Sequence, residues 1–78
     1  MIKERVKLVW DFKGPDAEHF ATHHEIHLKQ YAASRNLLDA LTSSEELGPM
    51  FWMATLTVNK ADMIQVRDAL RPHRGLKA

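Results

Sequence analysis

Residues 50–58 constrain the fold most, because this run reads Met-Phe-Trp-Met-Ala-Thr-Leu-Thr-Val and contains no charged side chain. Aromatic and β-branched residues of this kind favour strands. A strand that is apolar on both faces needs a cover on each of them. The run therefore predicts a central strand with a helix layer on one side. A partner subunit is the expected cover on the other side.

A second strand is expected at residues 2–12, where side chains of two kinds alternate. Every second residue from Ile2 to Phe12 is apolar except Glu4, and the residues between them are mostly charged. A period of two is typical of a half-buried strand. Gly14 and Pro15 end it.

Helical periodicity follows Pro15, which suits the first position of a helix, and continues to about Arg35. One broad stripe is formed by Ala17, Phe20, Ala21, His24, Leu28, Tyr31, Ala32 and Leu38. Glu25 falls on the opposite, polar side, where Lys29 makes a favourable i,i+4 pair with it. The segment is predicted to be a long amphipathic helix.

A second helix is expected after Asn59, a residue that favours the N-cap position. Met63, Val66 and Leu70 form its apolar stripe, and Pro72 ends it near Arg71.

Residues 36–49 carry mixed signals. Ser43 with Glu46 matches a capping box, and Gly48 with Pro49 is a stop signal, so a short helical turn is the first choice. Residues 37–41 could instead form a strand. The predicted order is β-α-β-α, an α+β chain. Two strands alone are only marginally stable, so either residues 36–49 and the tail add strands or a second copy of the chain does; we expect a homodimer.

Composition excludes several classes of function. The chain has 78 residues and no cysteine, which rules out disulfides and thiolate zinc sites. Its net charge is +1 with histidines neutral, and no basic residues interleave with the aromatic residues of 50–58, so nucleic-acid binding is not expected. No stretch is apolar enough to span a membrane, and the first residues are charged rather than apolar as a leader would be. We expect one domain over residues 1–78, located in the cytoplasm.

Histidines concentrate on the first helix. His19, His23 and His27 follow i, i+4, i+8 spacing and form one ridge at the edge of the apolar stripe. Histidines at i and i+4 project side by side and can share a divalent cation. The ridge is either a polar helix edge or a metal site, and no other cofactor is indicated.

His24 differs because it projects from the centre of the apolar stripe. A buried imidazole needs partners for its ring nitrogens, and Tyr31 on the same face is one candidate. Burial shifts the pKa of a histidine, so His24, with His27 one turn later, is the candidate general base. The alternative is a hydrogen-bonded histidine of the core.

Basic residues gather around the end of the second helix. Arg71 and Arg74 are suited to bind carboxylate or phosphate, and Pro72 would hold His73 in a defined turn. They could simply complement the helix dipole. If the tail folds back over the first helix, Arg71 and His73 could instead line one anion-accepting pocket with His24 and His27.

Four segments in this order resemble the ferredoxin-like subunits of the dimeric α+β barrel group. They are the strand at 2–12, the helix containing His27-Leu28-Lys29-Gln30-Tyr31, the strand at 53–58 and the helix at 61–70. The resemblance implies a ferredoxin-like or truncated ferredoxin-like two-layer sandwich. It also implies a dimer that pairs two sheets, and a histidine in the resulting cleft. The chain departs from the pattern at residues 37–47 and in a fourth strand reduced to the tail. No active-site residue of the group carries over by position.

Three functions follow from these patterns. The first is a small homodimeric module that binds a ligand or a protein through a histidine-lined pocket. The second is an enzyme in which His24 or His27 is a general base and Arg71 or Arg74 holds an anionic substrate. The third is divalent metal binding by His19, His23 and His27.

Overall fold

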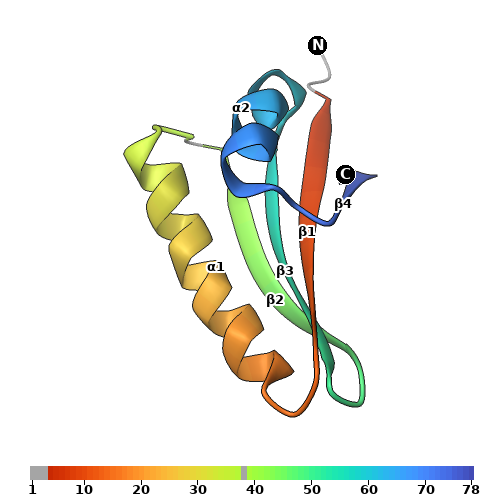
Figure 1. The fold of residues 1–78 in the computed structure, drawn as a ribbon. Helices are drawn as coiled ribbons and strands as arrows, with labels where there is room; N and C mark the ends of the chain where they lie inside the picture. The colour runs from red at the N-terminus through yellow and green to blue at the C-terminus, as the bar shows by residue number, and fades with distance from the viewer. Residues whose placement is uncertain (1–3, 38) are drawn as a thin grey trace.

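A computed structural model describes residues 4–37 and 39–78 of the chain. Within these residues a four-stranded antiparallel sheet is covered on one face by two helices, which gives an α+β fold of two layers (Figure 1). The strands lie in the order β2-β3-β1-β4. In chain order the elements are β1 (Arg5–Lys13), α1 (Ala17–Ser34), β2 (Leu41–Gly48), β3 (Phe51–Asn59), α2 (Lys60–Leu70) and β4 (Arg74–Lys77).

The β-α-β-α order predicted from the sequence is confirmed in part, because its four elements are present and the structure adds β2 and β4. The sequence left open whether the chain itself or a second copy completes the sheet. In the structure, the chain itself supplies both additional strands. The tail pairs with the outer edge of β1 over Val6–Val9, and β2 pairs with the outer edge of β3.

β1 confirms the alternation read from the sequence. Leu8 and Trp10 are buried against the helices, with Val6 and Phe12 packed at the margin of the same cluster. Val9 points to the other face of the sheet and is also fully buried. Residues 2 and 3 of the predicted strand lie outside the described residues.

β2 replaces the helical turn that was favoured for residues 36–49. Neither Ser43 nor Glu46 caps a helix, since both lie on the strand, opposite Thr55 and Trp52. The strand signal was weak because β2 contains serines and glutamates instead of branched apolar residues. Pairing with β3 gives its backbone the hydrogen bonds that a short helix would have supplied, and this tertiary pairing outweighs local propensity.

β3 is the central strand predicted from the apolar run. Ala54, Leu56 and Val58 face the helices, whereas Met53 and Thr55 are buried on the opposite, open face. On that open face, side chains of the same chain provide part of the cover. Arg74 pairs with Asp11, and Lys7 lies 4.0 Å from Glu45.

α1 packs through the predicted stripe, with Ala17, Ala21, Leu28 and Ala32 buried. The prediction that Phe20 belongs to the buried stripe is wrong, because its side chain is 53% exposed near the start of the helix. Glu25 is not on the outer side. It is half-buried and accepts hydrogen bonds from Thr42 and Ser44 of β2 at 3.2 and 3.0 Å. Leu38, also assigned to the stripe, lies outside the described residues.

α2 packs through Val66, with Met63 and Leu70 at the margin of the core, as its periodicity predicted. Asn59 occupies the N-cap position, but its side chain makes no capping hydrogen bond to a described residue. Arg71 adopts a left-handed conformation (φ 49°) and ends the helix before Pro72. Among the described residues, neither helix is long and apolar enough to cross a membrane.

Candidate functional site: the His24 site between α1 and β1

His24 lies where α1 faces β1, because it occupies the same helix face as Ala21 and Leu28. Its ring packs against two aromatic side chains of β1. The ring centroids are 5.1 Å from Trp10 and 5.6 Å from Phe12, with the planes tilted by 57° and 60°. Trp10 and Phe12 are two positions apart and therefore lie on the same face of the strand, where their rings face the helix side by side.

The Nε2 atom of His24 is shut off from solvent and has no hydrogen-bond partner among the described residues. Nδ1 is not enclosed in this way. Desolvation lowers the pKa of His24, and the neighbouring His27, His73 and His23 lower it further, because positive charge on them would repel a second charge. The fold therefore favours the neutral imidazole.

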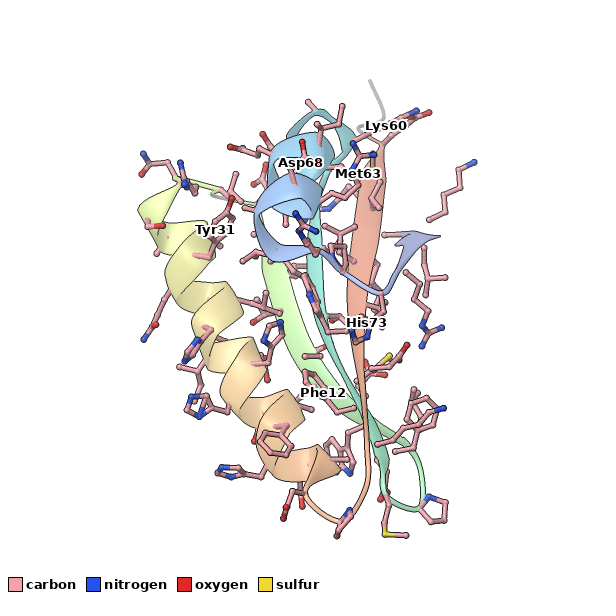
Figure 2. All side chains as sticks on the ribbon, viewed as in Figure 1. Phe12, Tyr31, Lys60, Met63, Asp68 and His73 are labelled. Atoms are coloured by element: carbon pink, nitrogen blue, oxygen red, sulfur yellow. The ribbon has the colours of Figure 1, made fainter. Side chains whose placement is uncertain are left out.

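Trp10 fixes one wall of this site, the His24 site. It is buried, and its indole Nε1 donates a hydrogen bond to the Leu70 carbonyl at the end of α2, at 3.0 Å. Phe12 is only half-buried and lies between α1 and the sheet (Figure 2). One aromatic ring is thus held rigidly by the second helix, while the other lies closer to solvent.

His73 lies beside β1, in the turn between α2 and β4 (Figure 2). Its backbone N–H donates to the Val9 carbonyl at 2.9 Å, and its ring Nδ1 accepts the Asp11 backbone N–H at 2.9 Å. The ring therefore takes the place of one more β4 residue in the ladder. With Nδ1 accepting, a neutral His73 carries its proton on Nε2.

His23 and His27 form a pair on the exposed side of α1. Their Nε2 atoms are 3.0 Å apart and their ring centroids 4.7 Å apart. The ring of His19 is 6.1 Å from that of His23. No group of three potential ligands close enough to hold one metal ion occurs among the described residues. The predicted ridge thus consists of a close pair and one more distant histidine.

The structure separates Arg74 from the His24 site. Arg74 lies on the open face of the sheet, where Nε and Nη2 each donate to the Asp11 carboxylate at 3.1 Å. Arg71 lines a hollow of about 420 Å³ with Arg67, Asp68 and Pro72. Of the anion-accepting pocket predicted from Arg71, His73, His24 and His27, the three histidines are neighbours, since His27 and His73 both act on the pKa of His24, and the place of Arg71 in that pocket stays a prediction.

Tyr31 does not pair with His24 among the described contacts. It packs at the margin of the core two turns further along α1, and the Arg35 guanidinium lies 5.4 Å from its ring.

Sequence reasoning did not include Trp10, Phe12 and Asp11 in the site. Alternation placed the two aromatic residues on the inner face of β1, but nothing local indicated that His24 would pack onto them. The contact of the Asp11 amide with His73 spans 62 positions, and no local pattern could have shown it.

A comparison with family models finds no match to this chain, and neither curated proteins nor solved structures give a significant one.

Proposed function

We propose that this chain is a ferredoxin-like subunit that binds a small molecule at the His24 site. The order β-α-β-β-α-β, with both helices on one face, supports the fold assignment. The observation that carries the function is a half-buried imidazole packed against two aromatic rings, with one nitrogen enclosed and without a hydrogen-bond partner among the described residues. An enclosed polar atom without a partner costs stability, and a role in ligand binding would account for a histidine at this position.

The surroundings of the ring suggest which nitrogen receives the ligand. Aromatic faces are electron-rich and accept an N–H more readily than they tolerate a lone pair. Packing against Trp10 and Phe12 thus favours a proton on the enclosed Nε2 of His24. Nδ1 then remains as an acceptor for a ligand.

The ligand class follows from these groups. Nδ1 of a neutral imidazole binds a hydroxyl or N–H donor, and half-buried Phe12 offers an apolar surface to the body of the ligand. Arg74 is engaged with Asp11 on the far side of the sheet. We therefore expect a neutral molecule with an aromatic or aliphatic body, rather than the anionic ligand that the basic tail indicated.

Ligand-observed NMR with a library of neutral, hydroxyl-bearing aromatic fragments tests this proposal. We expect hits that shift the Trp10 indole and His24 ring signals. These fragments should no longer bind His24→Gln, whereas His19→Gln on the same helix should still bind them. His24→Leu should bind no fragment and should unfold at a higher denaturant concentration than the parent. Fragments bound equally well by His24→Leu, or no hits at this site, would contradict the proposal.

A second candidate function rests on the lowered pKa of His24. A neutral imidazole at pH 7 can act as a general base. Any fragment that binds the wild type is incubated with it and followed by NMR over hours. Chemical conversion that stops in His24→Gln would identify an enzyme, whereas binding without conversion supports the binding module.

We also propose that two copies associate through the open face of the sheet. Leu41 and Leu76 lie at its two edges, in one row across the strands with Thr57 and Lys7, and are 65% and 42% exposed. The face carries charges of both signs, Lys7 with Glu45 and Arg74 with Asp11. A two-fold arrangement can therefore pair it with itself without net repulsion.

Sedimentation velocity tests this association. We expect a dimer for the wild type and a monomer for the double variant Leu41→Glu with Leu76→Glu. Ile64→Glu, which introduces the same charge at a 56% exposed position on α2, should stay dimeric. A monomeric wild type would overturn the association without affecting the ligand test.

A further inference from the structure

The His23–His27 pair has a geometry that the His24 site does not use. Both side chains are exposed, and their Nε2 atoms converge to 3.0 Å. Without a bound ion, one Nε2 must carry a proton and the other must accept it, because two lone pairs or two protons would repel at this distance. A metal ion can replace that shared proton when both rings carry their protons on Nδ1.

A bound ion would hold the two nitrogens at a separation set by its coordination geometry. An ion about 2.05 Å from each nitrogen holds them about 2.9 Å apart at a 90° angle, and about 3.35 Å apart at the tetrahedral angle. The observed 3.0 Å is nearer to the first value. Both separations are within about 0.4 Å of the hydrogen-bonded distance, so small rotations of the two exposed rings admit a divalent ion, and imidazole ligands suit Ni²⁺ and Cu²⁺.

His19 does not complete the site. Its ring is 6.1 Å from that of His23, and its position on the helix is two turns, about 12 Å, from His27. Two ligands come from the protein, and water fills the remaining positions of an exposed ion.

We propose that His23 and His27 form a bidentate site for Ni²⁺ or Cu²⁺ on the outer face of α1. The site differs from the His24 site, because its two Nε2 atoms meet on the exposed side of α1, whereas the His24 ring packs against β1. The proposal does not depend on ligand binding at His24. It narrows the three-histidine site expected from the sequence to one i,i+4 pair.

Isothermal titration of the whole chain with Ni²⁺ at pH 7.5 tests the site. We expect one ion per chain, and at least about tenfold weaker binding in His23→Gln and in His27→Gln, since each removes one arm of the chelate. His19→Gln is the matched control and should bind within about twofold of the wild type.

The Cu²⁺ form offers a second readout that does not depend on affinity. Its electron paramagnetic resonance spectrum should show hyperfine splitting from two nitrogens, and from one in either single variant. Circular dichroism verifies that the variants keep the fold. Variants His23→Gln and His27→Gln that bind Ni²⁺ like the wild type would overturn the proposal. An equal loss of affinity in His19→Gln would also overturn it, because the ion would then not be held by this pair.

Discussion

At the scale of single residues, His24 is a polar side chain at a position where the fold buries apolar surface. Its position in the apolar stripe was evident from spacing, and the structure packs its ring against Trp10 and Phe12. A leucine there would bury apolar surface without leaving a polar atom unpaired. The histidine therefore lowers stability, and the cost depends on pH.

His24 is expected to make the chain less stable in mild acid. Its pKa is lowered in the folded state, so the unfolded chain takes up the proton first as the pH falls below about 6.5. Above that pH, the ionisation of His24 does not reduce the free energy of unfolding. Below it, this free energy decreases until the pH reaches the pKa of His24 in the folded state. Burial contributes most to the lowered pKa, followed by the neighbouring His27, His73 and His23. Urea denaturation between pH 7.5 and 5 should show this loss in the wild type.

His24→Gln should reduce that loss, because glutamine does not titrate. His19→Gln, an exposed change on the same helix, should keep the wild-type dependence. If the denaturation midpoints of His24→Gln and the wild type shift in parallel with pH, His24 is not the group responsible.

His73 gives a second residue-scale expectation. Its ring accepts a hydrogen bond from the Asp11 amide just before β4 begins. We expect faster hydrogen exchange at the Asp11 amide in His73→Ala, while the Leu8 amide, on the β3 side of the strand, keeps its protection. Equal protection of Asp11 in both proteins would show that the ring does not close the ladder in solution.

At the scale of elements, β2 depends on α1 more than its sequence indicates. The Glu25 carboxylate accepts hydrogen bonds from Thr42 and Ser44, and Lys29 lies 3.9 Å from it. This contact holds a polar edge strand against the helix. It also explains why a glutamate assigned to the outer face of α1 is half-buried.

Glu25→Ala should lower the free energy of unfolding by about 1–3 kcal/mol, because it leaves two half-buried hydroxyls without their acceptor. Glu18→Ala, at an exposed position in the first turn of α1, should change it by less than about 0.5 kcal/mol. Chemical denaturation at pH 7.5 measures both. Equal effects of the two substitutions would mean that the contact between β2 and α1 contributes nothing specific.

At the scale of the whole molecule, one cluster of buried residues joins both layers. Leu28 from α1, Leu56 from β3 and Val66 from α2 are among its members, and each is at most 1% exposed. None of these elements has a core of its own, so they should unfold together.

Urea unfolding monitored by far-ultraviolet circular dichroism and by tryptophan fluorescence should therefore give coincident transitions. The fluorescence reports chiefly on Trp10, which is bonded to α2, and on Trp52 at the margin of the core. A fluorescence change that precedes the loss of helix would show that α2 detaches before the rest.

The sequence predicted those elements of the fold whose own residue pattern is sufficient to identify a strand or a helix. The alternation at residues 2–12, the apolar run at 50–58 and both helical stripes correspond to β1, β3, α1 and α2. Periodic apolar residues determine which face an element buries, whatever it packs against. The inward position of His24 and the close pairing of His23 with His27 followed from the same spacing.

Only the tertiary structure decided the remainder. β2 and β4 are polar or short, and they are strands because the edges of β3 and β1 offer hydrogen bonds to them. The same pairing places Arg74 on the open face, brings His73 onto the Asp11 amide and turns Glu25 toward β2. These contacts join residues 17 to 63 positions apart, and the free energy that selects them comes from the assembled sheet and not from any local propensity.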